Sequence, residues 1–264
     1  MSSEVPASYH TLADPPIPLP VTSSPCRSQD YYWDTIVLQV EDTLFRVPKY
    51  QLVGKSEIFD SMLSLPQGSN EPEGSSDDAP IKLSDISKTD FKSLLQVIYP
   101  RDAANPPELS IDSWISVLRL SSLWQMVDTR SNAISHLTQL LCNLSPADRI
   151  LLGRKFSVAH WISSGYVNLA ERGEVVSLEE AGKIGLSTAL LIHHVRESLW
   201  KRDNEHLHRS SRSRYYGDYN NYNDDECYEK PMEISRKDSV EEAVKLAFGE
   251  ELRDVEVEGD RFKD

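Results

Sequence analysis

The sequence predicts an α+β protein in which a small β-sheet is followed by a cluster of α-helices and then by an all-helical extension. Apolar and β-branched residues alternate over 36–40 and recur at 44–47 after a polar turn, as they do in a hairpin of half-buried strands. From residue 87 to 200, apolar residues instead recur three or four positions apart, as on one face of a helix. Both ends of the chain are poor in apolar residues, so the predicted core lies between them.

The strand pattern begins with Ile36, Leu38 and Val40, and a second apolar run at 44–47 follows a short polar turn. Two such runs predict a hairpin. Residues 52–63 have helical spacing, and Ile81-Lys82-Leu83 predicts a short third strand. The intervening segment 66–80 lies between prolines and is rich in Gly, Ser, Asp and Glu, which predicts an acidic flexible loop.

Serine caps mark the starts of several helices. Ser87 precedes a single apolar face and has Asp90 three positions later, a capping-box-like arrangement. Further starts are predicted at Ser110, at Ser145 before a first-turn proline, and at Ser177 with Glu180, and we expect a break at Gly185. The tryptophans at helical spacings are expected in the core: Trp114, Trp124, Trp161 and Trp200.

These patterns divide the chain into four parts. Residues 1–29 form a Pro/Ser-rich arm that we expect to be disordered. Residues 30–143 form the α+β domain, and residues 144–200 its helical extension. Residues 201–264 are expected to be a disordered tail with a short helix near 239–249, where Val240, Val244 and Phe248 line one side.

Charge and composition exclude several classes of protein. The net charge of −14 argues against a protein that wraps nucleic acid or binds an anionic membrane surface. Cys26, Cys142 and Cys227 are far apart and odd in number, so no disulfide framework is predicted and a reducing compartment, the cytoplasm or nucleus, is expected. Residues 1–20 lack the apolar run of a signal peptide, and no stretch approaches the ~18 apolar residues of a membrane span.

Three motifs in this order resemble the BTB/POZ domain over about residues 30–143. Asp34 opens a strand that leads to Phe45-Arg46-Val47-Pro48-Lys49, which is similar to the family's Phe-x-Val/Ala-His-Lys turn. Residues 52–63 are similar to its Leu…Ser-x-x-Phe-x-x-Met-Phe hairpin. Residues 81–99 resemble its Leu-x-Asp-Val…Phe…Leu-Leu…Tyr segment.

The chain departs from the family pattern at several points. Pro48 stands where many members have His, a change typical of some stand-alone branches. Cullin-binding members often have an apolar-x-Glu motif where this chain has Leu65-Pro66-Gln67, so cullin binding is in doubt. The chain has no Gly-Gly pair of a Kelch array and no Cys/His-spaced zinc finger.

The resemblance implies a non-enzymatic protein-interaction module that forms homo- or hetero-oligomers, with a homodimer expected. It places Asp34 and Lys49 in a charged pocket of dimeric members, together with Tyr31 and Trp33 in the self-association region. The alternative is that Asp34 and Lys49 form a structural ion pair, since an unpaired buried charge is costly. A second possible function is that of an adaptor for a cullin-type ubiquitin ligase, with Met62, Leu65 and Gln67 facing the cullin.

No motif in the sequence predicts catalysis, a cofactor or a metal site. There is no Gly-rich phosphate loop, no G-x-S-x-G and no H-E-x-x-H, and the adjacent His193 and His194 point in different directions on a helix. The basic run at 209–214 favours a solvated linker, with a tail that contacts nucleic acid as the alternative. Arg236 lies three positions before Ser239, so Ser239 is a candidate phosphorylation site, although it also fits a helix cap with Glu242.

Overall fold

The computed structural model describes residues 26–65, 72–101, 108–215 and 236–262. It forms two units, residues 1–33 and residues 34–264, which are treated separately. In the first unit, residues 26–33 contain neither helix nor strand, and most of the predicted 1–29 arm lies outside the described residues. All helices and strands below belong to the second unit.

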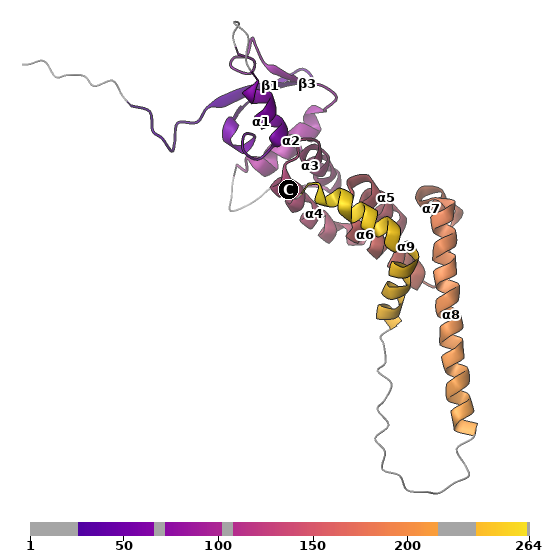
Figure 1. Ribbon diagram of the computed structural model, residues 1–264. Helices are drawn as coiled ribbons and strands as arrows, with labels where there is room; N and C mark the ends of the chain where they lie inside the picture. The colour runs from indigo at the N-terminus through magenta and orange to yellow at the C-terminus, as the bar shows by residue number, and fades with distance from the viewer. Residues whose placement is uncertain (1–25, 66–71, 102–107, 216–235, 263–264) are drawn as a thin grey trace, which may run out of the picture. The chain divides into compact units, whose positions relative to one another are not determined.

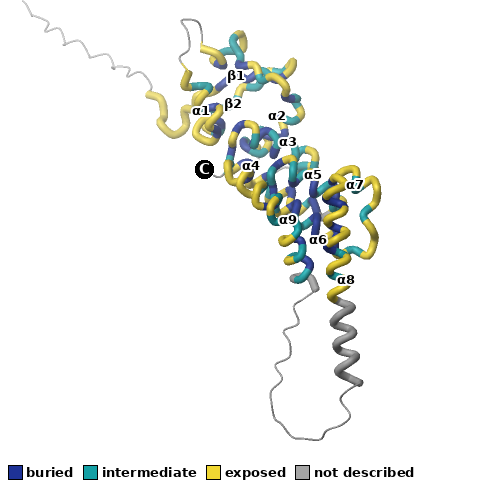
Figure 2. The backbone as a smooth tube through the Cα atoms, turned by 45° about the vertical axis from the view of Figure 1, so that its right-hand side comes forward, coloured by how far each residue is buried: buried dark blue, intermediate teal, exposed yellow. Residues whose placement is uncertain are grey.

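The sheet has β1 (Thr35–Val40), β2 (Thr43–Pro48) and β3 (Ile81–Leu83) in the order β2-β1-β3. β1 and β2 form the predicted hairpin, in which Val40 is paired with Thr43, and β3 runs parallel to β1 with Leu38 opposite Ile81. The central strand is the most buried, as its dark blue tube shows in Figure 2.

The loop before β3 is attached to the sheet, so its expected flexibility is corrected for residues 72–80. The Val37 amide donates to the Gly74 carbonyl over 2.8 Å, and Gly74 is buried with a φ of 80°. A Cβ at Gly74 would lie 2.8 Å from Ile36 Cγ1. Only glycine allows this approach, and Arg46 adds an ion pair of 2.8 Å to Asp77. Residues 66–71 lie outside the described residues.

Helices cover the sheet and build the first core. They are η1 (Lys49–Gln51), α1 (Glu57–Ser64), α2 (Lys88–Ile98), α3 (Ile111–Leu123), α4 (Val127–Leu140) and η2 (Leu141–Asn143). The Ser87 and Ser110 side chains cap α2 and α3 as predicted. Phe91 is fully buried and meets Phe45 and Trp124 edge to face. The predicted α+β fold class is therefore confirmed.

The extension builds a second core from α5 (Pro146–Phe156), α6 (Ala159–Glu171), α7 (Leu178–Ile184), α8 (Leu186–Tyr215) and α9 (Arg236–Asp260). α9 lies alongside α6 (Figure 1). Ser145 and Ser177 cap α5 and α7, and Gly185 separates α7 from α8, as the sequence predicts. Within the described ranges, none of the helices is both long and apolar enough to cross a membrane.

The structure corrects the expected C-terminal tail in three places. α8 continues to Tyr215 instead of ending at Trp200, and α9 is longer than the predicted 239–249 helix because its buried stripe continues to Leu252. Trp200 is 65% exposed and is not a core residue. Ser239 lies inside α9, which begins at Arg236, so it is not the N-cap. Residues 216–235 lie outside the described residues.

Candidate protein-interaction site

The helix α1 presents an apolar stripe to solvent. Ser56 fixes its start, because the hydroxyl accepts from the Phe59 amide over 3.2 Å and donates to the Trp124 carbonyl over 2.5 Å. Phe59, roughly a quarter turn further round the helix than Ile58, is buried and meets the Trp124 ring at 5.1 Å. α1 is therefore held firmly by its inner side, and its outer side is left free to contact another molecule.

We define the α1 stripe as Ile58, Met62 and Leu65. Ile58 and Met62 are four positions apart and share one side of α1, and Leu65 is the residue that directly follows the helix. Ile58 is 42% exposed, Leu65 is 63% exposed, and Met62 is half-buried against the core. The predicted cullin-facing residues Met62 and Leu65 thus lie together, whereas Gln67 lies outside the described residues. Sequence reasoning missed Ile58 as a surface residue, because it recognised only the helical spacing of residues 52–63.

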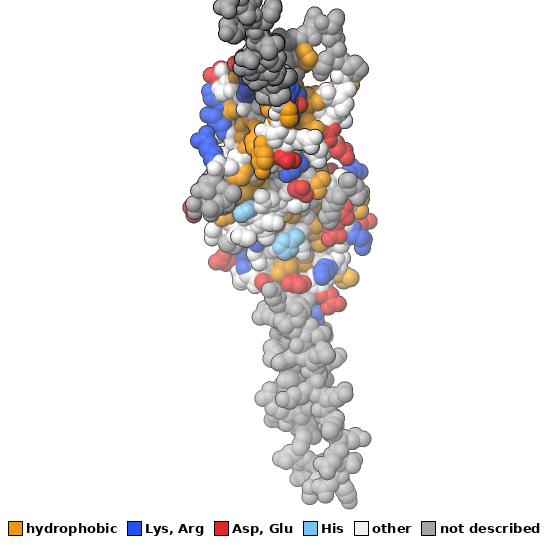
Figure 3. Space-filling model, turned by 90° about the vertical axis from the view of Figure 1, so that its left-hand side faces the viewer, with side chains coloured by type: hydrophobic (Ala, Val, Ile, Leu, Met, Phe, Trp, Pro, Cys, Tyr) orange, Lys and Arg blue, Asp and Glu red, His pale blue; other side chains and the backbone are white. Residues whose placement is uncertain are grey.

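The segment before α1 adds two more exposed apolar side chains, Tyr50 and Val53. The Tyr50 ring meets Tyr99 edge to face at 6.2 Å, and the Tyr99 hydroxyl donates to the Pro48 carbonyl. Burial, with a smaller effect of Tyr50, raises the pKa of Tyr99, so this hydroxyl stays protonated and keeps its hydrogen bond. Exposed apolar side chains also lie among charged ones on the face drawn in Figure 3.

Asp34 and Lys49 are brought together by the hairpin, where the Lys49 amide donates to the Asp34 carbonyl over 2.8 Å. The Asp34 side chain is exposed and Lys49 is half-buried. Among the ion pairs of the described residues, none joins these two side chains. The pocket role of both residues stays a prediction.

Tyr31 and Trp33 belong to the first unit and are exposed. The Trp33 indole donates to the Asp30 carbonyl over 3.1 Å, and the Arg27 guanidinium lies 4.7 Å from the centre of the neighbouring Tyr32 ring. Their predicted part in self-association stays a prediction.

A cavity of about 590 Å³ lies between α2, α3 and α4. Trp114 is part of its wall and stacks on His136 at 4.3 Å with an interplanar angle of 10°. The residues that line it gave no functional signal in the sequence, because each also fits an ordinary helix face. They are Gln96, Val97, Pro100, Glu108, Leu109, Trp114, Asn132, His136, Gln139 and Leu140.

The part of the chain that the structure describes contains no group of three His, Cys, Asp or Glu side chains placed to hold a metal ion. His193 and His194 are exposed on α8. The basic run 209–214 belongs to α8, but its side chains lie outside the description, so its contact with nucleic acid stays a prediction.

Comparison with protein-family models gives a match for the first core of the chain. No curated protein matches the sequence. Residues 24–141 match the family model of the BTB/POZ domain, a range that spans the three-stranded sheet and helices α1 to α4. The order of elements and the three resembling motifs agree with this match. Residues 24–141 therefore form a BTB/POZ domain.

Proposed function

We propose that this protein associates with a second copy of itself through the α1 stripe of its BTB/POZ domain. BTB/POZ domains are generally protein–protein interaction modules. The observation that carries the proposal is the exposure of Ile58 on α1 and of Leu65 directly after its last residue, while Phe59 anchors the helix to the core. Clustered exposed apolar side chains mark interaction sites more often than scattered ones do.

The geometry favours pairing of like surfaces. A two-fold interface uses the same patch on both copies, and a short helix with an apolar stripe can pack against its own symmetry mate. Tyr50 and Val53, which precede α1, would widen the buried area. The interface would therefore be apolar at its centre, as in stable homodimers.

The test measures the mass of the full chain by light scattering at micromolar concentration. We expect a species above monomer mass for the unchanged protein and a monomer for Ile58→Asp and Leu65→Asp, because each places a charge in the apolar interface. The matched control is Leu178→Asp, since Leu178 is 91% exposed on α7 outside the BTB/POZ domain, and it should keep the larger mass.

Circular dichroism of the variants separates loss of association from loss of fold. Both stripe variants should keep the helical signal and melting temperature of the control, because neither side chain is buried. A strictly monomeric unchanged protein would refute self-association. Unaltered mass in both stripe variants would show that another surface is used.

A cullin scaffold is the second candidate partner, favoured by the exposed position of Leu65 beside Met62 on the same stripe. It is distinguished by adding a purified cullin N-terminal region to the full chain. A new heterologous species, lost in Leu65→Asp, would favour the adaptor function. Recovery of the chain's own oligomer alone would favour the homotypic one.

A further inference from the structure

The last helix is held on the extension by a continuous apolar stripe. Its buried members are Val240, Val244, Phe248 and Leu252, and the Phe248 ring stacks on Tyr166 of α6 at 4.0 Å. Glu251 accepts from Arg154 over 2.9 Å and from the Tyr166 hydroxyl over 2.8 Å. These contacts fix the middle of α9 and leave its first turn to be held by other residues.

At that first turn, the Arg202 guanidinium of α8 donates to the Ser239 hydroxyl. Ser239 also borders a cavity of about 350 Å³ that is lined by residues of α6, α8 and α9 and of the 172–173 segment. Space for additional atoms therefore lies directly beside this hydroxyl, and no core side chain fills it.

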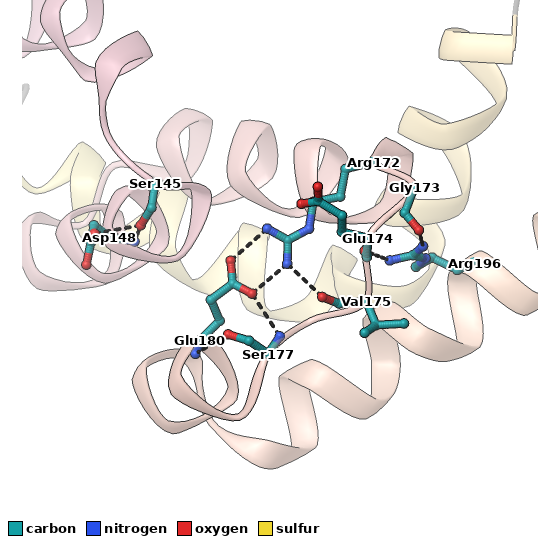
Figure 4. Close-up of polar contacts among 9 residues, drawn as sticks. All are labelled: Ser145, Asp148, Arg172, Gly173, Glu174, Val175, Ser177, Glu180 and Arg196. Carbon is teal, nitrogen blue, oxygen red and sulfur yellow. Dashed lines mark hydrogen bonds and ion pairs between the residues drawn. The ribbon is translucent and has the colours of Figure 1, made fainter.

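The arginines near this cavity differ in whether they pair with a carboxylate. Arg172 binds the Glu180 carboxylate over 2.7 and 2.5 Å through its two terminal nitrogens, whereas its buried Nε has no hydrogen-bond partner among the described residues. Arg196 donates to the backbone carbonyls of Gly173 and Glu174, as Figure 4 shows. Within the described ranges, neither Arg196 nor Arg202 forms an ion pair with a carboxylate.

Two carboxylates also line the cavity, and their negative charge offsets part of the positive charge of the arginines. Glu171 and Glu197 both line it. Glu197 is neutralised by Lys201 at 2.9 Å. The Arg202 guanidinium, which forms no ion pair with a carboxylate among the described residues, thus meets the neutral Ser239 hydroxyl, an arrangement that suits an added anion at Ser239.

We propose that Ser239 is a phosphorylation site and that its phosphate, bound by Arg202, locks α9 onto α8. A protein kinase would transfer the γ-phosphoryl group of ATP: the bond from Ser239 Oγ to phosphorus forms, the bond from phosphorus to the ADP oxygen breaks, and the hydroxyl proton passes to the base of the kinase. Arg236, three positions before Ser239, supplies the basic residue that such kinases prefer.

Phosphorylation of Ser239 and docking of α9 both depend on the equilibrium between the docked and the undocked state of the start of α9. Val240 follows Ser239 directly and is buried. A kinase therefore reaches the serine only when the start of α9 separates from the helices on which it packs. Once modified, the dianion gains a charge-assisted hydrogen bond in the docked state and also lies in the first turn of a helix, where negative charge is stabilised. Phosphorylation therefore traps the docked form.

This inference concerns α8 and α9, so it is independent of self-association through α1. The first test is phosphoserine installed at position 239 during translation of the full chain, followed by hydrogen exchange of the 236–252 amides. We expect exchange to slow by roughly tenfold, as one charge-assisted hydrogen bond provides. Arg202→Gln should abolish this gain, while Lys245→Gln, which removes an exposed basic side chain of α9 itself, should keep most of it.

The second test asks whether Ser239 is a substrate. Phe248→Ala should free α9, and a kinase that prefers a basic residue three positions before serine should then label the full chain at Ser239, as located by mass spectrometry, but not the Ser239→Ala form. Equal or faster exchange after phosphorylation, or an equal gain in Arg202→Gln, would overturn the lock. Absence of label in the freed chain would overturn the modification site.

Discussion

Truncation of Phe91 to Ala should destabilise the BTB/POZ domain severely. The side chain is fully buried, and its ring lies 4.9 Å from Phe45 and 5.9 Å from Trp124, both edge to face. Phe→Ala changes in cores cost about 3–5 kcal/mol, and each aromatic pair is worth roughly 0.5–1.5 kcal/mol beyond area burial. We therefore expect a cost near the upper end, ~4–5 kcal/mol, a large share of the ~5–15 kcal/mol of a typical domain.

The assay is urea unfolding of the full chain, followed by tryptophan fluorescence, since Trp124 contacts the altered site. The matched control is Leu95→Ala on the same helix, where the half-buried side chain should cost only about 2 kcal/mol. Phe91→Leu retains most of the volume and should be intermediate. If Phe91→Ala cost no more than Leu95→Ala, the assignment of Phe91 to the centre of the core would be refuted.

Three further outcomes are expected. Ser56→Ala should cost about 2–3 kcal/mol in urea unfolding, because it removes a helix cap and leaves a buried carbonyl without a donor; a cost below that of an exposed serine such as Ser64→Ala would contradict this. The Arg172 guanidinium lowers the pKa of Glu180 from 4.5 to about 2, so its contribution is present above pH 4.5 and is lost as the pH falls toward 2. The stability difference between the unchanged chain and Glu180→Gln should shrink over that window, and a pH-independent difference would refute it. Phe248→Ala should speed exchange of the α9 amides while the BTB/POZ domain stays protected, and no change in exchange would mean that other contacts hold α9.

The local elements were predictable because their signals are short-range. The hairpin, the third strand, the caps at Ser87, Ser110, Ser145 and Ser177 and the break at Gly185 each depend on a few neighbouring residues. Serine caps satisfy amides within the same turn, so the sequence contains both partners. The BTB/POZ fold followed from three such motifs in the correct order.

The errors arise where long-range contacts decide the outcome. Trp200 has a helical spacing that fits a core, but α8 turns this side outward. Gly74 holds the acidic loop through a hydrogen bond to Val37 on a distant strand, which its local composition conceals. The length of α9 was underestimated because its stripe is stabilised by α6, and a weak isolated pattern depends on such packing.

The position of α9 in the chain has a consequence for biosynthesis. Its apolar stripe covers Tyr166 and its neighbours on α6, yet about 80 residues separate the end of α6 from Leu252. At ~5–20 residues per second, a ribosome needs roughly 4–16 s to add them. During that interval all strands and helices of the BTB/POZ domain have already been made. The surface of α6 around Tyr166, which α9 covers in the folded protein, stays uncovered. The second core of the extension can therefore be completed only after α9 has been made, later than the core of the BTB/POZ domain.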